Sequence, residues 1–151
     1  MKAAPTREMI VAEARRWIGT PYHHQASLIG VGCDCLGLAR GIWRAVVGPE
    51  PELAPPYSPD WAEASGLESL ALAGERHFVS CDPRNFAPGD VLLFRWRDHL
   101  PAKHLAIASS AGRMIHAHNG ACVAEVSISA WWRRHLAFAY SFPGLDENRL
   151  S

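Results

Sequence analysis

The hydrophobic pattern of this chain changes from the period of helices to the period of strands shortly after residue 77. Before that point, apolar residues recur every three or four positions, as on one face of an α-helix. Beyond it, short apolar runs such as 91–94 are separated by turn residues, for example at 88–90 and 119–120. This order predicts an α+β fold in which N-terminal helices pack on a central antiparallel sheet.

Capping residues and apolar periodicity predict the individual elements. Helices are expected between Thr6 and Gly19, over 35–47 and over about 60–77. Strands are expected over 91–94, 104–108, 114–118, 121–126 and 137–142, with a short turn at 130–134 capped by Ser129. Residues 49–60 contain five prolines, which predicts an ordered surface connection or a short extended segment there.

Length and charge restrict the class of protein. The 151 residues predict a single domain, 1–151, which can bury about 68–70% of its unfolded surface without a disulfide or a metal. Lys plus Arg and Asp plus Glu number 15 each, which argues against a broad electrostatic grip on nucleic acid. No apolar run is long enough to span a bilayer, so we expect no membrane insertion. Residues 1–6 lack the apolar core of a signal peptide, which predicts synthesis in the cytoplasm.

The stretch 32–38 joins a loop rich in His and Gly to the second predicted helix, and it places Cys35 at the helix start. A helix start favours negative charge, so the pKa of Cys35 is expected to fall and its thiolate to act as a nucleophile. Such a nucleophile needs a base. His104 begins a predicted strand and His116 lies on the next one, so the two could serve as the base and the group that orients it. Spacing alone also allows each histidine to be an ordinary core residue.

A metal site is the alternative for the same residues. The potential zinc ligands are Cys33, Cys35, His116, His118 and Cys122. A Cys-x-Cys pair is tighter than usual zinc spacing, and the second pair is His-x-His, so we expect neither a metal nor a cofactor. Cysteines two residues apart rarely have disulfide geometry, so Cys33 is expected to be a plain thiol. Cys81 and Cys122 are expected to pack as small apolar groups.

Five motifs, taken in order, resemble those of the NlpC family of bacterial cell-wall peptidases, which are papain-like cysteine peptidases. They are Gly19-Thr20-Pro21-Tyr22, Cys33-Asp34-Cys35-Leu36-Gly37-Leu38, Pro88-Gly89-Asp90-Val91-Leu92-Leu93-Phe94, His104-Leu105-Ala106-Ile107 and Met114-Ile115-His116-Ala117. The resemblance covers about residues 7–142. It implies that Cys35 is the nucleophile on a helix that faces the sheet, that His104 is the base and that His116 is the third polar member. His118 is the reserve candidate for the third position.

The resemblance also implies how substrate is bound. Tyr22 and Asp34 match family positions that contact the substrate, often its free amine, and backbone N–H groups at the helix start would hold the oxyanion. The family cleaves amide bonds in peptidoglycan stem peptides, frequently after D-isoglutamate. Leu36 stands where the family usually has a serine that helps to bind the substrate amine. The resemblance therefore gives the reaction class and leaves open the bond cleaved, as well as hydrolysis versus transfer.

Three segments look closest to the subgroup of this family carried by phage tails and the related gene transfer agents. They are residues 24–27, 33–38 and 57–61. This likeness implies a peptidase that rides on a phage-like tail, has tail hub or tip proteins as partners, and opens the wall of the target cell for DNA delivery. The alternative is a structural tail component that has kept the fold and lost the activity.

Overall fold

The computed structural model describes residues 4–51, 69–118 and 120–146. Its helices are α1 (Arg7–Arg16), α2 (Cys35–Val46), α4 (Ser69–His77), α5 (Ala130–His135) and the 3-10 turn η1 (Pro83–Asn85). Its strands are β1 (Ser27–Leu28), β2 (Gly32–Cys33), β3 (Val79–Cys81), β4 (Val91–Phe94), β5 (His104–Ser110), β6 (Arg113–His116), β7 (Ala124–Ser127) and β8 (Leu136–Ser141). Within these described ranges, no helix is both long and apolar enough to cross a membrane.

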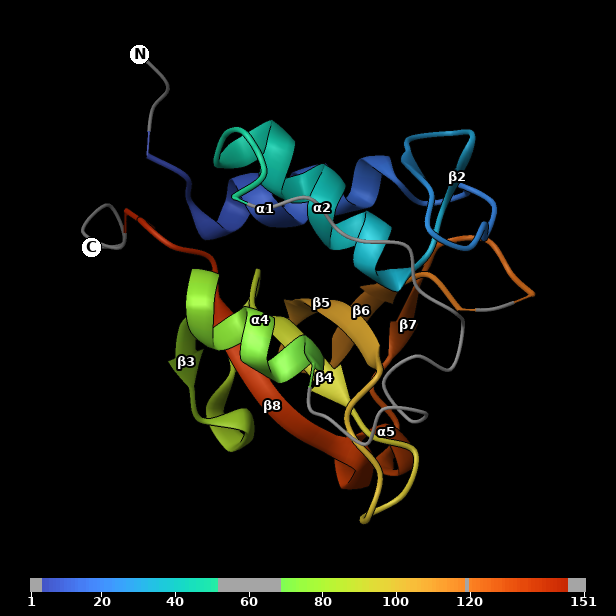
Figure 1. Cartoon of the computed structure of the whole chain (residues 1–151), viewed down its shortest axis with the longest axis vertical. Coiled ribbons are helices and arrows are strands. Elements are labelled where there is room, and N and C mark those ends of the chain that lie inside the picture. Colours follow the sequence, from blue (N-terminus) through green and yellow to red (C-terminus); the bar gives the residue numbers. More distant parts are fainter. Residues whose placement is uncertain (1–3, 52–68, 119, 147–151) are drawn as a thin grey trace.

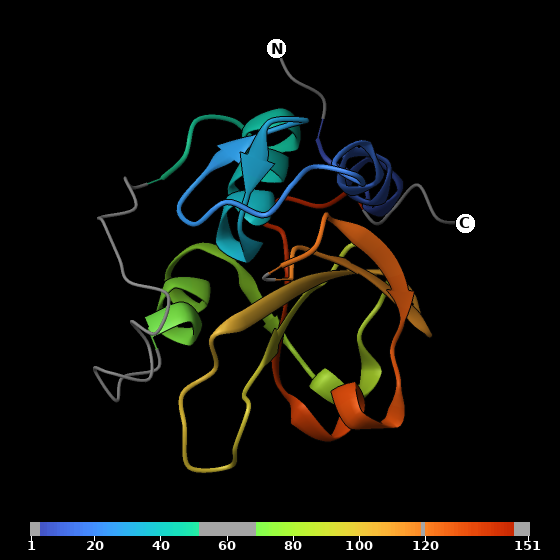
Figure 2. The same cartoon turned by 90° about the vertical axis from the view of Figure 1, so that its right-hand side faces the viewer.

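The centre of the fold is a six-stranded sheet in the order β3-β8-β4-β5-β6-β7, in which every pair of neighbours is antiparallel. The helices α1 and α2 form a layer across this sheet and pack on each other and on β5 (Figures 1 and 2). A separate two-stranded hairpin, β1-β2, lies beside α2 at the edge of this layer. This architecture confirms the α+β fold with a central antiparallel sheet.

Alternate residues of the strands supply two hydrophobic clusters on opposite faces of the sheet, because successive strand side chains point to opposite sides. The larger cluster joins the helical layer to the sheet and includes Ile10, Leu38, Ile42, Leu93, Leu105, Ile107 and Ile115. The smaller cluster includes Leu92, Phe94, Ala106, Ala108 and Met114. Trp132 of α5 packs against this second cluster, so α5 partly covers the face that the long helices leave open.

Two glycines let α2 pack closely against its surroundings. A Cβ atom on Gly37 would lie 1.8 Å from the carbonyl oxygen of Ala26, so only glycine allows the first turn of α2 to approach the preceding loop. A Cβ atom on Gly41 would lie 2.0 Å from the ring of Trp17, which is buried between α1 and α2. The position of the start of α2, and therefore of Cys35, depends on these contacts.

The helices confirm the predicted pattern where they are described. Thr6 caps α1 by accepting a hydrogen bond from the Met9 N–H at 3.1 Å, and α2 spans nearly the predicted range. The predicted third helix is confirmed for Ser69–His77, whereas residues 60–68 lie outside the described residues. Most of the proline-rich segment, from residue 52 onward, also lies outside them.

The strands occur as predicted, but several bounds differ. The third ends at His116 rather than at residue 118, and the fourth begins at Ala124 rather than at residue 121. The reason is that Val123 exchanges backbone hydrogen bonds of 2.8 and 2.9 Å with Gly19 and Thr20 instead of pairing with β6. The hairpin β1-β2 and the edge strand β3 were not predicted, because two or three residues give no readable period.

Candidate active site

The first residue of α2 is Cys35, and its half-buried side chain faces the beginning of β5. The sulfur lies 3.8 Å from the carbonyl oxygen of Lys103, to which the thiol can donate. The backbone N–H of Leu105 is also close enough to influence the thiol's ionisation. The sulfur therefore lies against the backbone on both sides of His104. Among the described residues, no hydrogen bond joins this thiol to a histidine ring.

Burial raises the pKa of the Cys35 thiol to about 12, and the nearby carboxylate of Asp34 acts in the same direction. The backbone N–H groups of Cys35, Leu36 and Leu105 lower this pKa but do not outweigh burial. The expectation that a helix start would depress the pKa of Cys35 is therefore wrong for the protein without substrate. The thiol is neutral at physiological pH, and a base must remove its proton during a reaction.

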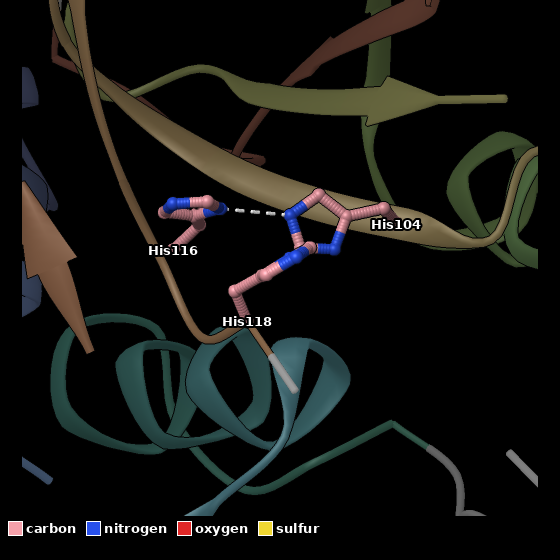
Figure 3. Close-up of side chains that lie close together, drawn as sticks. All are labelled: His104, His116 and His118. Atoms are coloured by element: carbon pink, nitrogen blue, oxygen red, sulfur yellow. Dashed lines mark hydrogen bonds between the residues drawn. The ribbon is translucent and has the colours of Figure 1, made fainter. Parts of the chain in front are cut away.

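The two predicted histidines lie together and are both buried. The Nε2 atom of His104 is 2.9 Å from the Nδ1 atom of His116, so one ring donates a hydrogen bond to the other (Figure 3). Burial, followed by the neighbouring His116, His118 and Lys103, holds the pKa of His104 well below its ordinary value. Burial and His118 lower the pKa of His116 to about 4. Both imidazoles are therefore neutral at physiological pH.

The hydrogen bond between these rings determines what His104 can do. If the proton of neutral His104 is on Nε2, that nitrogen donates to Nδ1 of His116, and the Nδ1 atom of His104 keeps a lone pair. A lone pair on Nδ1 can accept a proton from a thiol. His116 can accept the hydrogen bond because its own low pKa keeps it neutral. The geometry can thus provide a base and a group that orients it.

His118 lies just beyond the end of β6, and its side chain is exposed. In the β5-β6 register His116 is opposite Ala106, so a continued ladder would put residue 118 opposite His104. The ring centroids of His104 and His118 are 5.5 Å apart. His104 makes its hydrogen bond to His116, which favours His116 over the reserve candidate for the orienting position.

Two tryptophans, which sequence reasoning did not find, lie together on one side of His104, with their own ring centroids 5.8 Å apart. The ring of Trp96 stacks on His104 at 5.5 Å, and the ring of Trp132 stacks on it at 5.3 Å. Trp96 follows β4 in a polar loop and Trp132 comes from α5, so no local spacing connects either residue to β5. Their rings shield that side of the imidazole from water.

Asp34 and Tyr22, the two predicted substrate-contacting residues, flank Cys35. The buried carboxylate of Asp34 accepts hydrogen bonds of 2.7 Å from the backbone N–H groups of Gly37 and Gln25, which caps α2 and fixes the preceding loop. Burial, with Cys35 as the next contribution, raises the pKa of Tyr22 to about 12. Tyr22 therefore keeps its hydroxyl proton beside the thiol. Substrate contact by both residues stays a prediction.

The structure does not assemble the alternative Cys/His zinc set. Within the described part of the chain, the group of potential ligands that lies together is His104, His116 and His118, without a cysteine. All four cysteines are free thiols, as expected for Cys33. Cys81 is half-buried and packs against the smaller cluster, but Cys122 is exposed, so its predicted apolar packing is wrong. Cys122 lies in a short bridge to Pro21, which keeps it outside the core.

Comparisons with known proteins agree with this geometry. No family model matches the chain. It is 28% identical over 137 residues to the gamma-DL-glutamyl hydrolase of Bacillus subtilis, an alignment that covers 90% of this chain. The chain spans only 29% of the length of that curated relative.

Solved structures of NlpC/p60 proteins share the fold. The NlpC/p60 domain of the peptidoglycan hydrolase SagA matches with a TM-score of 0.65 and 25% identity, over 91% of this chain and 99% of that one. An NlpC/p60 family protein of Bacillus cereus matches with a TM-score of 0.68 and 20% identity, over 93% and 41% of the two chains. NlpC2 of Trichomonas vaginalis matches with a TM-score of 0.64 and 18% identity, over 94% of this chain and 48% of that one. The chain therefore has the papain-like fold of NlpC/p60 domains and is similar to the peptidoglycan hydrolases of that type.

Proposed function

We propose that this chain is a cysteine endopeptidase that cleaves amide bonds in the stem peptides of peptidoglycan. One observation carries the proposal: the Cys35 sulfur lies against the backbone on both sides of His104, and His104 is hydrogen-bonded to His116. The helix α2 then supplies the nucleophile, β5 supplies the base and β6 supplies the group that orients the base. The similarity to NlpC/p60 hydrolases supports the same reaction class.

In the proposed reaction, Nδ1 of His104 takes the thiol proton as the sulfur of Cys35 attacks the amide carbon. The charge on His104 is stabilised by the hydrogen bond from its Nε2–H to His116. The tetrahedral intermediate collapses when His104 gives the proton to the departing amine, which leaves a thioester on Cys35. A water molecule, deprotonated by His104, then hydrolyses the thioester and regenerates the thiol.

Backbone N–H groups at the start of α2 would bind the oxyanion of this intermediate. The first hydrogen bond within α2 runs from the Leu38 N–H to the Asp34 carbonyl at 2.9 Å, and the Gly37 N–H is bound by the Asp34 side chain. The N–H groups of Cys35 and Leu36 precede both, and both are close enough to lower the pKa of the thiol. An anion that forms on the substrate carbonyl would meet these same donors.

The relatives point to the class of bond. The Bacillus subtilis relative is named a gamma-DL-glutamyl hydrolase, and SagA is named a peptidoglycan hydrolase. We propose that this chain cleaves next to a γ-linked glutamyl residue of the stem peptide. Leu36 packs against the larger core cluster and offers no hydroxyl to a substrate amine, so recognition of that amine falls to Tyr22 and its neighbours.

A comparison of cysteine variants on purified peptidoglycan sacculi tests the proposed nucleophile. Cys35→Ala should abolish the loss of turbidity that the wild-type protein causes, because it removes the sulfur that lies against the backbone on both sides of His104. Cys122→Ala is the matched control, because that thiol is exposed and should be dispensable. Equal clearing by Cys35→Ala and the wild type would refute Cys35 as the nucleophile.

We also propose that the peptidase is carried on a phage-like tail, with tail hub or tip proteins as partners, and acts at the wall of the target cell. The likeness of residues 24–27 and 33–38 to tail-borne members of the family supports this proposal. Mass spectrometry of purified tail particles tests it, and particles without the chain would refute it. A chain found in particles but inactive on sacculi would instead favour the structural alternative.

A further inference from the structure

Three imidazole rings converge where β5 begins and β6 ends. His104, His116 and His118 each offer one ring nitrogen, and these three atoms lie within 4.8 Å of one another (Figure 3). The strand register is consistent with the convergence, because its extension by two residues beyond the Ala106–His116 pair would place residue 118 opposite His104, with His116 on the diagonal. Peptide cleavage as proposed above uses only two of these rings, and His118 has no part in it.

The chemistry of this set suits a transition metal ion. Neutral imidazole is a good ligand for Zn²⁺, at a Zn–N distance of about 2.0–2.1 Å, and tetrahedral binding then separates two ligand nitrogens by about 3.3 Å. The facing nitrogens of His104 and His116 are already 2.9 Å apart. The third ligand, His118, is exposed, so its side chain can rotate inward with little loss of packing. The group contains no carboxylate, which disfavours Ca²⁺ and Mg²⁺.

We propose that His104, His116 and His118 bind a divalent transition metal ion of the Zn²⁺ type, and that this ion reversibly inhibits the peptidase. The binding stands on the cluster itself, whereas the inhibition rests on the proposed function. The ion is an inhibitor rather than a cofactor, because it competes for the ring that would serve as the base. His118, at the exposed side of the cluster, is the ligand that is specific to the metal-bound form.

Either way of binding His104 removes the base. If its Nδ1 atom binds the metal, the lone pair needed for the Cys35 proton is occupied. If its Nε2 atom binds the metal, the neutral ring carries its proton on Nδ1, and that nitrogen again has no lone pair. The hydrogen bond to His116 is lost in the second case, since both facing nitrogens become ligands. Removal of the ion restores the hydrogen-bonded pair.

The binding test uses a Cys35→Ala/Cys122→Ala background, which removes the half-buried thiol beside His104 and the exposed thiol of Cys122, and makes the result independent of catalysis. Isothermal titration with Zn²⁺ should show one site, and Co²⁺ should give the visible absorption of a four-coordinate nitrogen site. His118→Ala and His118→Asn should each weaken Zn²⁺ binding by on the order of tenfold or more, because even outer partners of metal ligands contribute that much. His99→Ala is the control, since His99 is also exposed but outside the cluster.

Failure of the background protein to bind Zn²⁺, or unchanged affinity in both His118 variants, would overturn the metal site. The second measurement compares two proteins, Cys122→Ala and its His118→Ala derivative. For each, the rate of sacculus hydrolysis with Zn²⁺ is divided by the rate without Zn²⁺. The derivative should need at least about ten times more Zn²⁺ for half-inhibition. Equal sensitivity would overturn the regulatory role. A protein that never hydrolyses sacculi would refute the proposed function, while the titration would still decide the metal site.

Discussion

Replacement of Asp34 by alanine should destabilise the protein strongly, because this side chain accepts hydrogen bonds from two backbone N–H groups. Loss of a helix N-cap costs about 0.5–2 kcal/mol, and here the cap bond to the Gly37 N–H is buried and 2.7 Å long. The second oxygen holds the Gln25 N–H at 2.7 Å, and a donor left without its partner costs about 1–3 kcal/mol. Together we expect a loss of about 2–4 kcal/mol, or roughly 5–15 °C in Tm for a chain of this size.

Urea unfolding followed by circular dichroism measures this loss, with Thr6→Ala as the matched control. Thr6 caps α1 through one exposed bond of 3.1 Å to the Met9 N–H, so its removal should cost about 1 kcal/mol. The reasoning is refuted if Asp34→Ala is no less stable than Thr6→Ala. Wild-type stability combined with a raised KM would instead show that Asp34 acts only by contacting substrate.

Three further predictions concern the ionisable groups. With chelator present, alkylation of Cys35 by iodoacetamide should be slower at pH 7–8 than alkylation of the exposed Cys122, because the pKa of Cys35 is raised to about 12. Peptide mapping by mass spectrometry measures both rates, and fast reaction of Cys35 near pH 6 would contradict a neutral thiol. His116→Ala should lower kcat on a defined stem peptide by on the order of 10²-fold or more, whereas His116→Asn, which keeps an acceptor for His104, should retain much more activity. Equal loss of kcat in the two variants would argue against the orienting hydrogen bond. The hydrogen bond from Arg15, followed by that from Ser109, lowers the pKa of Glu125 to about 2. The ionised Glu125 side chain therefore contributes its full stabilisation of the folded state above the ordinary pKa of 4.5, and this contribution is lost as the pH falls towards 2. Because Arg15 is half exposed, Glu125→Gln should lower the free energy of unfolding by only about 1 kcal/mol at pH 7. Urea unfolding measures this difference from the wild type, and a difference that failed to narrow by pH 3 would be inconsistent with the linkage.

The sequence predicted the elements with clear periods and caps, and it predicted much less of how they meet. Thr6 before an apolar repeat and Cys35 after Asp34 located the starts of α1 and α2, because capping is a local property. The pairing of Val123 with the Gly19–Thr20 backbone could not be predicted, since it joins segments about a hundred residues apart. The same holds for the tryptophan rings on His104.

The candidate site shows the same division. His104 and His116 could be placed on neighbouring antiparallel strands from the turn between them, and the structure brings their facing nitrogens to 2.9 Å. The ionisation of Cys35 could not be read from its position at a helix start. Burial beneath other segments outweighs the local backbone N–H groups, and burial is a property of the whole fold.

The most direct test of the central claim is mass spectrometry of muropeptides after digestion of purified sacculi. The wild-type protein should release fragments that carry one new carboxyl and one new amine at a stem-peptide amide bond, and Cys35→Ala should release none above the untreated control. Identification of those fragments names the bond cleaved as well as the activity. The same fragments from Cys35→Ala, or no new termini from the wild-type protein, would contradict the account.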